Sequence, residues 1–148
     1  MKVARHLQTQ DVYMGRFNYG DDIITALQAF SLENNIRAAW VNIIGAVSKA
    51  TLSYYDQQEH KYFSKAFKGE YEIVSCSGNI SLKDEKPMAH IHIVLSDTEY
   101  GAHAGHLIPG SSAIFAGEFV IFAFDKSNQA HPDLVRVLDE QTGLPLWQ

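Results

Sequence analysis

The chain has 148 residues, 46% hydrophobic and 20% charged, so it can bury a substantial core and is not expected to be disordered. Its formal net charge of −5 disfavours DNA binding, because duplex binding draws much of its affinity from Lys and Arg side chains that neutralise phosphates. No segment approaches the roughly 18 apolar residues of a membrane-spanning helix and no export signal is readable, so we expect a cytoplasmic protein with no membrane partner.

The first elements along the chain are extended pieces followed by a helix. Residues 2–18 read as two extended pieces, and Gly20 precedes two aspartates, Asp21 and Asp22, either of which can cap a helix by accepting a hydrogen bond from its first free amides. The polar residues Ser31, Glu33, Asn34 and Asn35 bring this helix to its end. Its apolar side chains recur at helical spacing and form one stripe that must lie on a sheet: Ile23, Ile24, Ala26, Leu27 and Phe30.

From residue 36 onward the pattern changes to short runs rich in β-branched and aromatic residues, separated by glycines. These runs predict strands at 38–44, 50–55, 61–67, 71–77, 90–95 and 113–124, and a last short strand within 131–138. The apolar tail at 146–148 is a segment that could pack on a neighbouring subunit. The predicted fold class is α+β: a single compact domain in which an antiparallel β-sheet packs against one main helix.

The single cysteine, Cys76, lies in the strand-like run 72–78. It has no second cysteine with which to form an internal disulfide. We therefore expect it to behave as a small core residue rather than as a catalytic thiol.

The histidines of the chain carry its strongest chemical signal. His90 and His92 stand at i and i+2 in a strand, so their imidazoles project to the same face, and His106 follows fourteen residues after His92. Three imidazoles with a fourth position left open are typical of reactive zinc, although copper, nickel, cobalt and iron also accept imidazole. The alternative is that the strand carries two half-exposed histidines by chance and His106 sits in a turn.

Taken together, the segments resemble the PPC domain, the plant and prokaryote conserved domain also known as DUF296, in a stand-alone prokaryotic form. The resemblance covers about residues 5–138 of a single domain spanning 1–148. It rests on Gly20-Asp-Asp-Ile-Ile-Thr-Ala-Leu, Ile36-Arg-Ala-Ala-Trp-Val-Asn-Ile-Ile-Gly-Ala-Val, Thr51-Leu-Ser-Tyr-Tyr, Gly69-Glu-Tyr-Glu-Ile-Val-Ser-Cys-Ser-Gly, Ala89-His-Ile-His-Ile-Val-Leu-Ser-Asp, Gly105-His-Leu-Ile-Pro-Gly and Ala116-Gly-Glu-Phe-Val-Ile.

The resemblance implies a homotrimer and, in prokaryotic members, a zinc ion held by the histidines that are here His90, His92 and His106. Ala104 departs from the usual Gly-Gly-His-Leu at its first glycine. The neighbouring His103 is an alternative ligand, and we prefer His106. Plant relatives join this domain to Arg-Gly-Arg-Pro hooks that enter the DNA minor groove, and no such core occurs in this sequence.

Two hypotheses for the function follow. In the first, a metal-bound water or substrate serves a small-molecule enzyme or sensor, with Glu118 or Asp97 as the proton shuttle. Against this role, Glu118 could form an ion pair with Arg16, Arg37 or Arg136, and Asp97 could be a turn residue. In the second, the trimer is a protein-interaction or DNA-binding scaffold without catalysis, and the metal stabilises the loop that carries His106.

Overall fold

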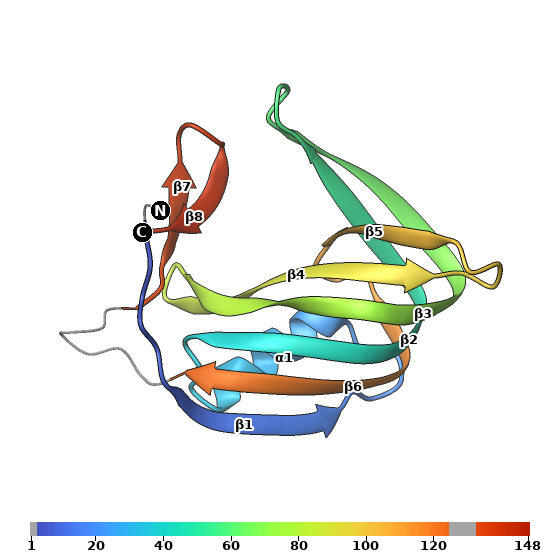
Figure 1. The fold of residues 1–148 in the computed structure, drawn as a ribbon, viewed down its shortest axis with the longest axis horizontal. Helices are drawn as coiled ribbons and strands as arrows, with labels where there is room; N and C mark the ends of the chain where they lie inside the picture. The colour runs from blue at the N-terminus through green and yellow to red at the C-terminus, as the bar shows by residue number, and fades with distance from the viewer. Residues whose placement is uncertain (1–2, 125–132) are drawn as a thin grey trace.

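The computed structural model describes residues 3–124 and 133–148, and a long, curled antiparallel sheet dominates it (Figure 1). Within these residues the strands of this sheet lie in the order β1-β6-β2-β3-β4-β5. Their bounds are β1 (Thr9–Arg16), β2 (Ala39–Asp56), β3 (Lys61–Lys83), β4 (Lys86–Ser96), β5 (Ala102–Leu107) and β6 (Ala113–Phe124). The sheet with one covering helix confirms the predicted α+β class.

The predicted helix is α1 (Ile23–Glu33), and the cap is Asp22. The Asp22 Oδ1 atom accepts a hydrogen bond from the Thr25 amide at 2.9 Å. Ile23, Ile24 and Leu27 are buried against the sheet, and Figure 1 shows α1 lying across one of its faces. No helix in the described part of the chain has the length and apolar character to cross a membrane.

The curled part of the sheet is formed by β2 and β3, and both strands are far longer than the sequence predicts. Each continues through a glycine, Gly45 or Gly69, where two separate runs were expected. Register shifts of the β2–β3 pair accompany both passages, between Ile43 and Gly45 on β2 and, beside Gly69 of β3, between Val47 and Lys49. At its far end β2 also pairs with β5, through Leu52 and Leu107. The distal β2–β3 hairpin therefore rises away from the flat part of the sheet (Figure 1).

The two faces of the sheet differ in character. The face toward α1 is apolar and buried, and it includes Ile91 on β4 and Cys76 on β3, which is 2% exposed as predicted. On the other face the register places Trp40 opposite Asn79, and Asn79 opposite His90. The strand period therefore directs His90 away from the helix.

The C-terminal residues form a separate antiparallel hairpin of β7 (Arg136–Asp139) and β8 (Leu144–Trp147). This confirms the last predicted strand as far as it can be followed, since positions 131 and 132 lie outside the described residues. In the apolar tail, the Trp147 indole donates a hydrogen bond to the Ser81 hydroxyl at 3.1 Å, whereas Leu146 is 38% exposed. The hairpin is joined to β3 by a bridge between Leu82 and Val135.

Candidate metal centre

Three imidazoles meet on the face of the sheet that is turned away from α1. His90 and His92 project from β4, and the β4–β5 register pairs His92 with His106. The ring centroids lie 5.2 Å apart for His90 and His92, 5.1 Å for His90 and His106, and 5.4 Å for His92 and His106. We call these three residues the histidine cluster.

The histidine cluster fits the requirements of a transition-metal site. One ring nitrogen from each residue lies within 4.8 Å of the others. Imidazole nitrogens bound at about 2.0–2.1 Å around a tetrahedral zinc ion stand roughly 3.4 Å apart, so modest side-chain rotations would bring all three onto one ion. A metal ion held by these three ligands from two adjacent strands would keep one side open.

The surroundings of the histidine cluster lower the pKa values of two of its imidazoles. Burial, together with Arg136 and the other two imidazoles, lowers the pKa of His90 to about 4. Burial also lowers the pKa of His106, with contributions from His92 and Arg136. At neutral pH these rings are therefore uncharged, which is the state in which imidazole binds a metal ion.

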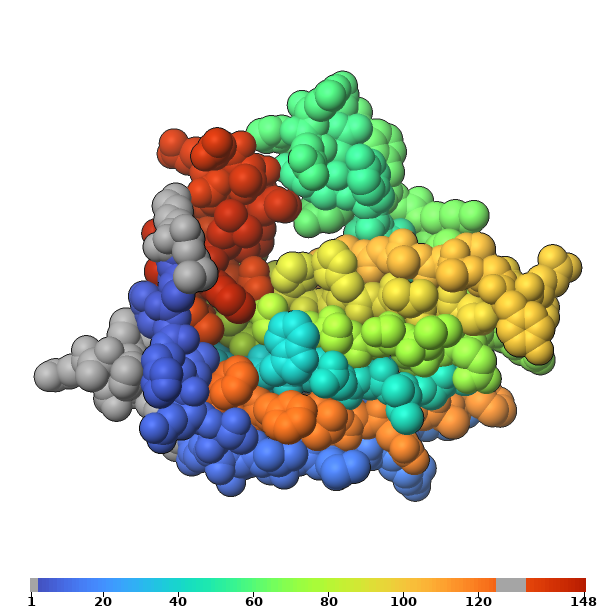
Figure 2. Space-filling view, in the orientation of Figure 1, coloured from blue at the N-terminus to red at the C-terminus, as the bar shows by residue number. Residues whose placement is uncertain are grey.

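The histidine cluster lies beneath two projecting hairpins. Tyr62, near the distal end of β3, places its ring 5.7 Å from that of His106. On the opposite side, Arg136 of β7 places its Nη2 atom 3.5 Å from His90 Nδ1. Figure 2 shows an open gap above β4 and β5, bounded by the β7–β8 hairpin and the distal β2–β3 hairpin. His92 is exposed, so the histidine cluster is accessible to solvent.

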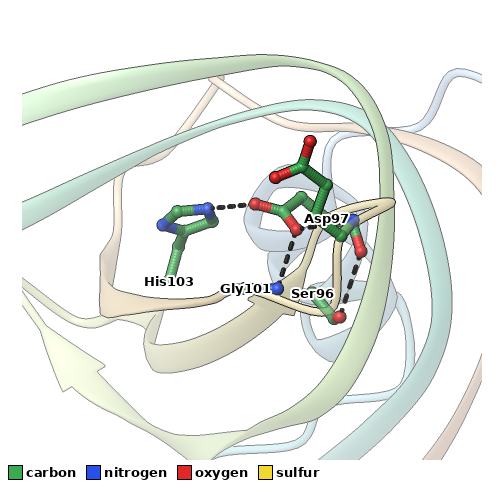
Figure 3. Close-up of polar contacts among 5 residues, drawn as sticks. Ser96, Asp97, Gly101 and His103 are labelled. Carbon is green, nitrogen blue, oxygen red and sulfur yellow. Dashed lines mark hydrogen bonds and ion pairs between the residues drawn. The ribbon is translucent and has the colours of Figure 1, made fainter.

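His103, the alternative ligand, lies apart from the histidine cluster. It is three residues before His106 on β5, so the strand period directs the two side chains to opposite faces. Its Nε2 atom lies 2.9 Å from Oδ2 of Asp97, and its ring centroid lies 4.8 Å from that of Phe67. Figure 3 shows the His103 ring directed toward the Asp97 carboxylate.

Asp97 occupies the turn between β4 and β5 and is held by local contacts. Its Oδ1 atom accepts hydrogen bonds from the amides of Gly101 at 2.8 Å and Glu99 at 3.0 Å. The hydrogen bond from His103 and those from Gly101 and Glu99 lower the pKa of Asp97. The expected turn position is thus observed, and the carboxylate is directed to His103.

Glu118, the other candidate shuttle, is exposed on β6. In the strand order three sheet spacings separate β6 from β4, which is about 14 Å at the usual strand separation. The register places Arg16 directly opposite Glu118 in the β1–β6 pair. Arg37 instead pairs with Asp133, and the hydrogen-bond partners of Arg136 are neutral groups. Within one chain Glu118 is therefore remote from the histidine cluster.

Sequence reasoning did not find two neighbours of the histidine cluster, Arg136 and Tyr62. Arg136 is 46 residues from His90 along the chain, and no motif links them. Only the folding of β7–β8 against the end of β3 brings its guanidinium to the site. Tyr62 reaches His106 because β3 is continuous through Gly69, which the sequence pattern does not predict.

Comparison with protein families identifies the fold independently. A model of the Plants and Prokaryotes Conserved (PCC) domain matches residues 4–125. The match includes α1 and the strands that carry all three members of the histidine cluster. It ends before β7 and β8.

Solved structures with the same fold include proteins from archaea and bacteria. The metal-containing protein AF0104 from Archaeoglobus fulgidus is 36% identical, with a TM-score of 0.90 over 100% of this chain and 99% of that one. A plant- and prokaryote-conserved (PPC) protein from Pyrococcus horikoshii is 27% identical, with a TM-score of 0.89 over 99% and 96%. A candidate DNA-binding protein from Bacteroides thetaiotaomicron is 29% identical, with a TM-score of 0.84 over 97% and 96%.

A curated relative is the bifunctional protein GlmU of a Synechococcus strain, which is 29% identical over 111 residues. The match covers 74% of this chain but 17% of that protein. The chain thus corresponds to a small part of this relative.

Proposed function

The chain belongs to the Plants and Prokaryotes Conserved domain family, and on that premise we propose that it binds a transition-metal ion, zinc by preference, through His90, His92 and His106. The observation that carries the proposal is the convergence of three imidazole nitrogens within 4.8 Å on an accessible face. The metal-containing relative from Archaeoglobus fulgidus supports it, because the two folds superpose over the whole chain.

We further propose that the site receives a small molecule. A zinc ion on three imidazoles supplies a Lewis-acidic position at which water or a substrate oxygen can bind. Side chains of the chain itself surround the path to that position. His92 is exposed to solvent, Tyr62 lies beside His106, and Arg136 lies beside His90. Asp97 and Glu118 remain the predicted proton shuttles. The Asp97 carboxylate contacts His103, and Glu118 lies on β6, three strands away from β4.

The proposed assembly is a homotrimer. The sheet face turned away from α1 exposes large apolar side chains that a soluble protein usually covers. Trp40 is 43% exposed, Ile44 61% and Met14 84%, and the first two lie on one face of β2. Association through this face would bury them beside the histidine cluster, which lies on the same side of the sheet.

The alternative function is a scaffold that binds protein or DNA, with the metal stabilising β5. The candidate DNA-binding relative from Bacteroides thetaiotaomicron favours considering DNA, whereas the net charge of −5 argues against it. Binding through phosphate contacts would weaken steeply with salt. Absence of duplex binding near 0.1 M salt, about the concentration at which the Debye length is 10 Å, would exclude DNA as a partner.

The decisive experiment is elemental analysis of untagged protein, after purification and after incubation with zinc. We expect about one metal ion per chain in the wild type and loss of it in His92→Ala and His106→Ala. His103→Ala and His60→Ala are matched controls, since both remove an imidazole outside the histidine cluster and should keep the metal. A wild-type protein without metal after incubation, or equal metal content in all variants, would contradict the proposal.

A further inference from the structure

The guanidinium of Arg136 is fixed in place beside the histidine cluster. Its Nε atom donates to the Ser81 hydroxyl at 2.9 Å, Nη1 to the Pro145 carbonyl at 3.0 Å, and Nη2 to the Asn79 amide oxygen at 2.8 Å. The ring of Trp147 lies 5.3 Å from its Cζ atom, and the residue is 8% exposed. These contacts orient the guanidinium, and each of the three hydrogen-bond partners is neutral.

A buried cation in this position does not help to hold a metal ion. Nη2 is 3.5 Å from His90 Nδ1, so its charge repels any cation bound by the histidine cluster. A divalent ion and Arg136 together bring three positive charges, which neutral imidazoles do not offset. The arrangement becomes favourable when an anion joins both groups.

Arg136 also has donors left for such an anion. A guanidinium carries five N–H groups, and the three hydrogen bonds to Ser81, Pro145 and Asn79 use one each on Nε, Nη1 and Nη2. One N–H on Nη1 is outside these bonds, and the second N–H on Nη2 is directed to His90 Nδ1 at 3.5 Å, the longest of the four contacts. An anion that takes the place of this long contact meets one N–H on Nη1 and one on Nη2, and paired N–H donors on a planar guanidinium match the two oxygens of a carboxylate or phosphate group.

The space beside these donors suits a small organic molecule. A hollow of about 370 Å³ is lined by Asn79, His90, Arg136, Asp139 and Trp147, among others. The Asp139 carboxylate accepts hydrogen bonds from the amide and hydroxyl of Thr142, each at 2.9 Å, and this ties it to the β7–β8 turn. Trp147 supplies an apolar wall. The volume exceeds that of a bare ion and lies at the lower end of the range of small-molecule sites.

We propose that Arg136 forms an anion subsite, and that the ligand of the metal centre is a small molecule with a carboxylate or phosphate group shared between the metal and this guanidinium. The inference rests on the proposed function, because it needs a metal on the histidine cluster. It adds the substrate class and a specificity-determining residue from β7, a strand that lies outside the segment matched by the family model.

The test uses full-length protein loaded with Co²⁺, whose visible absorption spectrum reports on its ligands, titrated separately with inorganic phosphate and with acetate. In the wild type we expect a saturable spectral change with at least one of these anions, and the more effective one identifies the preferred headgroup. Arg136→Met should bind the same amount of Co²⁺ but at least about tenfold less anion at equal concentration. Arg136→Lys keeps the positive charge but lacks the paired N–H donors of a guanidinium. Its anion binding should lie between that of the wild type and that of Arg136→Met.

The controls separate this inference from the proposed function. Arg37→Met removes a guanidinium that pairs with Asp133 elsewhere on the molecule, and it should titrate like the wild type. Circular dichroism checks folding, and Arg136→Lys carries the test if Arg136→Met does not fold. Failure of the wild type to take up Co²⁺ overturns the metal site and the subsite together. Normal Co²⁺ uptake with no anion response, or with equal responses in the Arg136 variants, overturns only the subsite.

Discussion

His92 and His106 are cross-strand partners in the β4–β5 ladder, with ring centroids 5.4 Å apart. A metal ion held by both would link β4 to β5, the shortest strand of the main sheet. Zinc should therefore raise the thermal midpoint of unfolding, and a chelator should reverse the change. At a free zinc concentration a hundred times Kd, the stabilisation is about 2.7 kcal/mol if the unfolded chain does not bind the ion.

The matched variants for this prediction are His106→Ala and His103→Ala, followed by differential scanning calorimetry with and without zinc. His106→Ala should lose the zinc-dependent shift, whereas His103→Ala should keep it even if its own midpoint is lower. An equal zinc-dependent shift in the wild type and His106→Ala would show that the ion binds elsewhere.

At Gly78, beside the histidine cluster, the backbone of β3 lies close against that of β4. A Cβ atom added there would lie 1.9 Å from the carbonyl oxygen of His90 and 2.9 Å from the Cα atom of Ile91. Because both contacts are with backbone, Gly78→Ala must move β4. We expect a loss of about 2 kcal/mol or more in the free energy of unfolding and weaker metal binding.

Urea denaturation and metal titration of Gly78→Ala would test this, with Ser75→Ala as the control. Ser75 is exposed on the same strand, so its loss should change stability by less than about 0.5 kcal/mol. Wild-type stability in Gly78→Ala would contradict the close approach of the two strands.

The sequence predicted α1 well because its determinants are local. Asp22 caps the helix through a residue three positions away, and the apolar stripe follows the helical period. It did not predict β5, because Ala102–Leu107 contains two alanines and a glycine, which have low strand propensity, and no β-branched or aromatic hydrophobic residue. That strand is specified by its neighbours β4 and β2, which are tertiary contacts. The sequence did not predict the role of Arg136 for the same reason, because its position beside His90 depends on the packing of β7 against the main sheet.

Asp22 joins the start of α1 to the segment before β6. Besides capping Thr25, its Oδ2 atom accepts hydrogen bonds from the amide and hydroxyl of Ser112, at 2.9 and 2.7 Å. Asp22→Ala should cost about 2–3 kcal/mol in urea denaturation, since a cap is lost and the buried Ser112 hydroxyl loses its acceptor. Asp21→Ala, which removes one exposed hydrogen bond from the Asn18 amide, should cost less.

The stabilisation from Asp22 should depend on pH. Burial alone would raise its pKa, but the hydrogen bonds from Thr25 and Ser112 outweigh burial and hold the pKa below 3.8. A carboxyl with a lower pKa in the folded state stabilises the fold above the unfolded pKa and loses this effect as pH falls through the folded value. The stability difference between wild type and Asp22→Ala should therefore shrink below pH 3.8. A constant difference would contradict the ionised contact.

Cys76 should not react in the folded protein. Its side chain is 2% exposed, and burial raises the pKa of its thiol to about 12, so thiolate is scarce at neutral pH. A disulfide reagent should label the native protein at least about a thousandfold more slowly than the urea-unfolded chain, because labelling requires opening. Rapid labelling of the native protein would place Cys76 outside the core.

Ile44 offers a direct test of the proposed trimer. It is 61% exposed on the apolar face of β2 and stands opposite Glu118 in the β2–β6 register, so a lysine there can pair with that carboxylate in the isolated chain. Ile44→Lys should dissociate the assembly without unfolding it, because a charge buried between subunits costs several kcal/mol. Sedimentation and native mass spectrometry should show a trimer for the wild type and monomers for Ile44→Lys. The control is Leu32→Lys, which replaces a 68% exposed leucine on α1 and should stay trimeric. A monomeric wild type, or a trimeric Ile44→Lys, would rule out this face as the interface.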